Sequence, residues 1–181
     1  MNEKGTNYDL HEISRNHKGT SRYNVLWQHL EETSFFTDPA STKYHCNYTG
    51  GLHEHSYNVM RNLLLLTEKL NLQWSDSESP RIIGLAHDVC KIGAYLPNDE
   101  GGYTHNQDQP KGHGDLSVWL VEKWISLTDE EKACIRWHMG AYDDKENWNK
   151  YNEAIHKFPN VLWTHTADMM ATHIDEIRKV I

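Results

Sequence analysis

The chain has 181 residues, a length at which a single domain with one hydrophobic core is the usual arrangement. Hydrophobic residues make up only 38% of the chain, but seven tryptophans and nine tyrosines supply the large apolar surfaces that disordered chains lack. The formal net charge of −8 and the lack of a basic run argue against duplex nucleic acid as the main partner, although they do not exclude a small phosphorylated ligand.

The cysteines and the first residues indicate the compartment. Cys46, Cys90 and Cys134 are far apart and form no C-x-x-C pair, so neither a disulfide framework nor a cysteine-rich zinc site is indicated. Charged residues stand where a signal peptide would have its apolar core, and no apolar run is long enough to cross a bilayer. We therefore expect a cytoplasmic protein that does not associate with membranes.

Hydrophobic periodicity predicts an all-α fold. Residues 1–21 are polar and without periodicity, which indicates an N-terminal arm before one helical domain over residues 22–181. Apolar residues recur at helical spacing in the remainder, and a bundle of about six to seven helices is expected. The helical segments are residues 23–36, 52–70, 80–92, 112–127, 128–140 and 159–181.

Local signals define some of the connections between these helices. Thr128 followed by Glu131 forms the capping-box pattern of a helix start. Residues 94–111 are rich in Gly, Asn, Asp and Pro and predict a long surface loop, a kind of segment that is often functional. Residues 143–157 are interpreted as a polar insert before the last helix.

Several of the 13 histidines lie on the apolar faces of the expected helices. A single histidine at such a position is more often a hydrogen-bonded core residue than a metal ligand. Here, however, His87 and Asp88 are adjacent near the end of one helix, His55 precedes them on another, and Asp168 follows on a third. The order H…HD…D on three core helices indicates a metal site far more specifically than any one of these residues does.

With these motifs the sequence resembles the HD-domain superfamily of metal-dependent phosphohydrolases, and in particular its exoribonuclease-like branch. The resemblance is carried by GGLHEHS at 50–56, LAHDVCKIG at 85–93 and HTADMMATHID at 165–175, and it spans roughly residues 44–175. It implies that His55, His87, Asp88 and Asp168 bind a first metal ion.

Two further histidines extend the resemblance to the two-metal members. His113 lies in KGHGDLS and His138 in IRWHMG, and by resemblance they complete a second ion that Asp88 bridges to the first. Six nitrogen and oxygen ligands without a thiolate suit Fe, Mn, Zn or a similar divalent ion. Two such ions activate a hydroxide and neutralise charge on a phosphate during in-line displacement.

These residues predict hydrolysis of a phosphomonoester or phosphodiester in a small nucleotide-like substrate. Asp88 and Lys91 are the candidate catalytic residues, because Lys91 follows Asp88 by one helical turn and its ammonium can bind a phosphate oxygen. Alternatively, Lys91 is a helix-terminal cation stabilised by the helix dipole. The chain lacks the basic, aromatic barrel with which exoribonucleases bind RNA, so processive RNA degradation is not expected.

Two other functions stay open at this point. The same ligand order occurs in mixed-valent di-iron oxygenases of the superfamily, and a regulatory protein can retain the metal site as a scaffold. Among the residues around the motifs, we expect His53 and Arg136 at the surface. Tyr44, Tyr95 and Tyr103 are candidates for stacking against a base. Neither the oligomeric state nor the specific substrate follows from the sequence.

Overall fold

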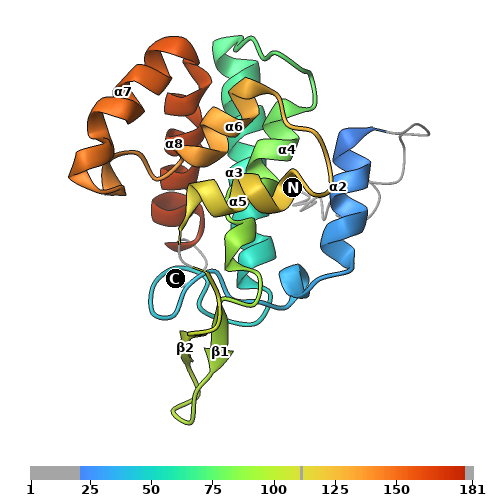
Figure 1. The fold of residues 1–181 in the computed structure, drawn as a ribbon, viewed down its shortest axis with the longest axis vertical. Coiled ribbons are helices and arrows are strands. Elements are labelled where there is room, and N and C mark those ends of the chain that lie inside the picture. Colours follow the sequence, from blue (N-terminus) through green and yellow to red (C-terminus); the bar gives the residue numbers. More distant parts are fainter. Residues whose placement is uncertain (1–20, 111, 178–181) are drawn as a thin grey trace, which may run out of the picture.

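The computed structural model describes residues 21–110 and 112–177, which form a bundle of helices with a small hairpin at one end (Figure 1). The predicted helical bundle of about six to seven helices is confirmed, and the described part of the chain contains seven α-helices beside the hairpin. The predicted arm over residues 1–21 falls almost entirely outside the described residues. The α-helices are α2 (Arg22–Glu31), α3 (Gly51–Leu70), α4 (Ser79–Ala86), α5 (Gly114–Val121), α6 (Asp129–Arg136), α7 (Trp148–Lys157) and α8 (Asn160–Met170).

Helix α3 is the central element of the bundle and packs against α4 and α8 (Figure 1). Its apolar face is completely buried at Leu52, Val59 and Leu63. The contact with α4 is very close at Gly84, where an added Cβ atom would lie 2.3 Å from Cα of Met60. Because only glycine permits this approach, the end of α4 lies beside the first half of α3.

Helix α4 is shorter than predicted. It ends at Ala86, and a separate 3₁₀ turn over Val89–Lys91 follows, whereas the sequence predicted one helix to residue 92. The physical reason is a side-chain hydrogen bond: Nδ1 of His87 donates to the carbonyl oxygen of Gly84 at 2.9 Å, the acceptor that the amide of Asp88 would use in a continuing helix. Hydrophobic periodicity contains no signal for this break.

Helix α6 begins with the predicted capping box, in which Thr128 accepts from the amide of Glu131 and the Glu131 carboxylate accepts from the amide of Thr128. It too ends early, at Arg136, and Nδ1 of His138 donates to the carbonyl oxygen of Ile135 at 2.7 Å. His87 and His138 therefore both lie just beyond a helix end, each oriented by a carbonyl three residues earlier.

Two segments expected to be irregular contain regular structure. Residues 94–111 include β1 (Tyr95–Pro97) and β2 (Tyr103–His105), an antiparallel hairpin with Tyr95 opposite His105; strands of three residues are too short to show periodicity. Residues 143–157 include α7, whose Tyr151, Ala154 and Ile155 pack against the core. These residues have the helical spacing of three and four in the sequence, but the polar residues between them obscure that pattern.

The remaining elements are short. They are the 3₁₀ turns Ser34–Phe36, Gly140–Tyr142 and Lys145–Asn147, and a π-helical turn over Ala171–Asp175 that extends α8. Among the described residues, no helix is both long and apolar enough to cross a membrane.

Candidate metal centre

The six predicted ligands lie together around the carboxylate of Asp88, although they come from five separate parts of the chain. His55 is on α3, His87 and Asp88 follow α4, and His113 precedes α5. His138 follows α6, and Asp168 is on α8. We call these residues the six-residue cluster: His55, His87, Asp88, His113, His138 and Asp168.

The two oxygens of Asp88 face different histidines. Its Oδ2 lies 3.5 Å from Nε2 of His55 and 3.4 Å from Nε2 of His87. Its Oδ1 lies 3.3 Å from Nε2 of His113 and 3.5 Å from Nε2 of His138. Asp168 joins the first side, with its Oδ1 at 3.2 Å from Nε2 of His55. A carboxylate with histidines on both sides has the arrangement of a ligand shared by two ions.

Each histidine of the cluster is held through its other ring nitrogen. Nδ1 of His87 and of His138 donates to a backbone carbonyl, and Nδ1 of His55 lies 2.8 Å from Oε1 of Glu176. Nδ1 of His113 lies 3.2 Å from Sγ of Cys90. A proton on Nδ1 leaves the lone pair of Nε2 directed towards Asp88, which is the tautomer that metal binding by Nε2 requires.

Burial and unmet hydrogen bonds also fit a metal site. His55, His87, Asp88 and His138 are at most 1% exposed. Oδ1 of Asp88 and Nε2 of His138 are both buried and have no hydrogen-bond partner among the described residues. Such atoms are costly to bury unless a ligand satisfies them. The buried histidines and aspartates are thus compatible with a metal site, and their nitrogen and oxygen donors suit divalent ions such as Fe, Mn or Zn.

The charges of the cluster are strongly coupled. Burial would raise the pKa of Asp88, but the ammonium of Lys91 and then the ring of His87 hold that pKa well below its usual range. Burial likewise opposes the ionised form of Asp168, whose hydrogen bond from His55 keeps its pKa low. Both carboxylates are therefore ionised at neutral pH and available as ligands.

The histidines differ in the direction of their pKa shifts. Burial lowers the pKa of His55, but hydrogen bonds to Asp168 and Glu176 outweigh burial and raise the pKa to about 9. Burial similarly lowers the pKa of His138, and the neighbouring Asp88 raises it above its usual value. Burial dominates for His87, whose pKa is lowered, and for His113, whose pKa falls to about 4.

Lys91 is at the edge of the cluster and not on a continuous helical face with His87 and Asp88, because the helix breaks between them. Its Nζ donates to Oδ2 of Asp88 at 2.7 Å, and that carboxylate keeps the pKa of Lys91 above its usual value in spite of burial. Lys91 is thus a permanent positive charge directly beside Asp88.

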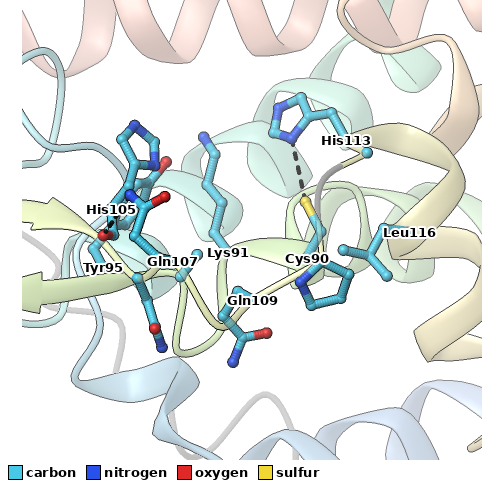
Figure 2. A pocket seen from close by; sticks show the side chains of 12 residues that line it. Cys90, Lys91, Tyr95, His105, Gln107, Gln109, His113 and Leu116 are labelled. Atoms are coloured by element: carbon cyan, nitrogen blue, oxygen red, sulfur yellow. Dashed lines mark hydrogen bonds between the residues drawn. The ribbon is translucent and has the colours of Figure 1, made fainter.

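A cavity of about 430 Å³ opens next to Lys91 and His113. Its walls come from the turn after α4, the hairpin segment and the start of α5. In Figure 2, Tyr95, His105 and Gln107 lie on one side of the cavity, Cys90 and Leu116 on the other, and Lys91 between them. The hairpin segment, which the sequence indicated as a functional loop, therefore forms a wall beside the cluster.

Sequence reasoning did not identify Glu176 or Cys90, the residues that hold His55 and His113. Glu176 lies 121 positions from His55, and a lone carboxylate near the end of a helix shows no motif. Cys90 lies within the HDVCK motif, but its contact with His113 depends on how α5 packs.

The structure corrects two expectations about residues near the cluster. His53 is half-buried and packs among aromatic rings, with its ring centroid 4.7 Å from that of Phe36. Arg136 is not a solvated charge, since it forms ion pairs with Asp115 and Asp143. His165 holds the backbone of a cluster residue, because its Nδ1 donates to the carbonyl oxygen of His138 at 2.8 Å.

Comparison with known proteins adds no further assignment: no family model, no curated protein and no solved structure matches the chain. The geometry of the cluster therefore carries the functional argument.

Proposed function

We propose that the protein is a two-metal phosphohydrolase of the HD-domain type that cleaves a phosphoester of a small nucleotide-like molecule. The observation that carries this proposal is the environment of Asp88, whose two oxygens each face a pair of histidine Nε2 atoms. His55, His87, Asp88 and Asp168 would hold one ion, and Asp88, His113 and His138 the other.

The chain's own groups have distinct parts in the proposed reaction. When bound, two divalent ions supply an activated hydroxide and neutralise charge on the phosphate. Lys91 adds a positive charge at the boundary between the cluster and the cavity, where it attracts a phosphate oxygen. The buried histidines are shielded from water, and the cavity, whose wall includes His113, offers a substrate a route to the cluster.

The direct test is phosphate release by purified protein loaded with Mn or Fe, measured on a panel of nucleotides and simple phosphoesters. Asp88→Asn should abolish release, because one oxygen of the proposed bridge becomes an amide nitrogen that cannot bind a cation. Lys91→Ala should lower kcat/KM by about tenfold to a thousandfold through loss of a charge that stabilises the phosphate. Glu153→Gln, an exposed change on α7, should leave the activity unchanged.

Metal content gives an independent check. Elemental analysis should find two ions per wild-type chain and one ion per chain in the double variant His113→Ala/His138→Ala. A protein that binds metal but releases no phosphate from any ester, or that forms product only with oxygen, would refute the hydrolase proposal and leave the metal centre standing.

A further inference from the structure

The residues of the cluster differ in their exposure. His55, His87 and His138 are almost completely buried, whereas His113 is 35% exposed and lines the cavity together with Lys91. A ligand whose phosphate lies against the cluster beside His113 can place the rest of its structure in this cavity. The cavity volume of about 430 Å³ is within the usual range for sites that bind small molecules.

The walls of the cavity indicate the chemistry of that remaining part. No carboxylate is present among the described residues that line it, and Lys91 is their only permanently charged side chain. The described part of the walls therefore offers no partner for a cationic group, and the charge of Lys91 is at the phosphate end. Leu116 supplies apolar surface on the opposite side of the cavity from Tyr95 (Figure 2), and Pro110 is a further apolar lining residue. Apolar surface together with an aromatic ring suits a flat, uncharged group.

Two amide side chains are available for hydrogen bonding in the same cavity. Gln109 makes no side-chain hydrogen bond with any described residue, although it lies beside Gly93. Gln107 makes one long bond, from its Nε2 to the carbonyl of His105 at 3.3 Å. An amide offers a donor and an acceptor side by side, which is the pattern by which glutamine recognises the edge of a nucleobase.

We propose that this cavity binds the base of a nucleotide, with Tyr95 stacking on the ring and Gln107 and Gln109 hydrogen-bonding to its edge. The base then lies in the cavity while the phosphate lies between Lys91 and the cluster. This inference rests on the proposed function for the phosphate end and extends it by naming the residues that select the substrate. Enzymes that hold single bases use the same combination of stacking and edge recognition.

The kinetic test compares substrates with and without a base. For wild-type protein loaded with Mn, kcat/KM is measured on the nucleoside 5′-monophosphates and on ribose 5-phosphate, which carries the same phosphate and sugar but no base. In Gln107→Ala/Gln109→Ala the ratio of nucleotide to ribose 5-phosphate should fall by about tenfold or more, because two hydrogen bonds are lost. Tyr95→Leu should lower the same ratio, and Gln28→Ala, an exposed glutamine on α2, should leave it unchanged.

A binding test does not depend on turnover. Equilibrium dialysis of metal-free protein with unphosphorylated nucleosides should show binding that the double variant weakens by about tenfold and Gln28→Ala leaves intact. If wild-type protein binds nucleosides in this way but releases no phosphate, the cavity assignment holds and the hydrolase proposal fails. If wild-type protein hydrolyses ribose 5-phosphate with the same kcat/KM as every nucleotide, and the double variant shows the same ratio of kcat/KM values, the hydrolase proposal holds and the cavity assignment is overturned.

Discussion

At the residue scale, the orientation of a ligand is determined by its second hydrogen bond. The ring of His55 has two nitrogens, and the 2.8 Å contact of Nδ1 with Glu176 determines that Nε2 faces Asp88 and Asp168. Groups that orient a ligand histidine in this way typically contribute strongly to metal affinity without touching the ion. Glu176 is therefore a positioning residue for the cluster.

Replacing Glu176 should weaken metal binding while every ligand remains. We expect Glu176→Ala to lower the affinity for the ion held by His55 by about 10-fold to 100-fold, because the ring is then free to rotate or change tautomer. Glu176→Gln, which keeps an acceptor oxygen, should lower this metal affinity less. Isothermal titration with Mn checks this order, with Glu153→Gln as the exposed control; equal affinities for all three variants would contradict the role of Glu176.

The raised pKa of His55 predicts proton release on metal binding. In the metal-free protein a pKa of about 9 keeps His55 protonated at pH 7, with Nε2–H directed to Asp168. An ion bound at Nε2 must displace this proton, so the apparent affinity should rise as pH increases towards 9 and level off above it. Titration calorimetry at pH 7 in two buffers of different ionisation enthalpy measures the protons released; heats that do not depend on the buffer would contradict the assignment.

At the scale of elements, close helix contacts bring the ligands together. Gly84 allows α4 to approach α3 and places His87 beside His55, with their Nε2 atoms 3.2 Å apart. Gly114 has the same effect at the start of α5, where an added Cβ atom would lie 2.2 Å from the carbonyl oxygen of Arg136. The rings of His113 and His138 consequently lie 5.1 Å apart.

A methyl group at Gly84 should separate α3 from α4. Because the added atom would meet the backbone of Met60, which cannot move aside as a side chain can, we expect Gly84→Ala to lower the free energy of unfolding by about 1–3 kcal/mol. Urea denaturation of the metal-free protein measures the loss. Gly102→Ala in the hairpin is the matched control, since its Cβ atom would make only ordinary contacts of 3.5 Å or more; equal losses in both variants would argue against the tight contact.

At the scale of the whole molecule, the cluster joins five parts of the chain, so any ion bound there also connects the helices that carry them. Ligands that bind only the folded state stabilise it in proportion to the logarithm of their concentration over Kd, by about 2.7 kcal/mol at a hundredfold excess over Kd. The folded state of this protein should therefore depend on metal.

Removal of metal should lower Tm. For a chain of this length we expect a decrease of about 5–10 °C on dialysis against a chelator, and recovery when Mn or Fe is added back. Differential scanning calorimetry checks both steps. The Tm of Asp88→Asn should change neither on chelation nor on metal addition. A wild-type Tm that changes on neither treatment would contradict a metal site in the cluster.

The sequence by itself determined the helical class and the capping box at Thr128, because apolar periodicity and capping patterns are local properties of the chain. It also indicated the six cluster residues through the order of the motifs and, for His113 and His138, through a family resemblance. It did not predict the breaks after Ala86 and Arg136, the hairpin or α7. Those depend on hydrogen bonds of single side chains and on packing against distant helices.

Only the tertiary structure decided how the six residues are oriented and what surrounds them. Glu176 reaches His55 across 121 positions, and Gln107, Gln109 and Lys91 line one cavity together with His113 and Leu116. Such contacts result from how helices pack in three dimensions, and no spacing along the chain encodes them.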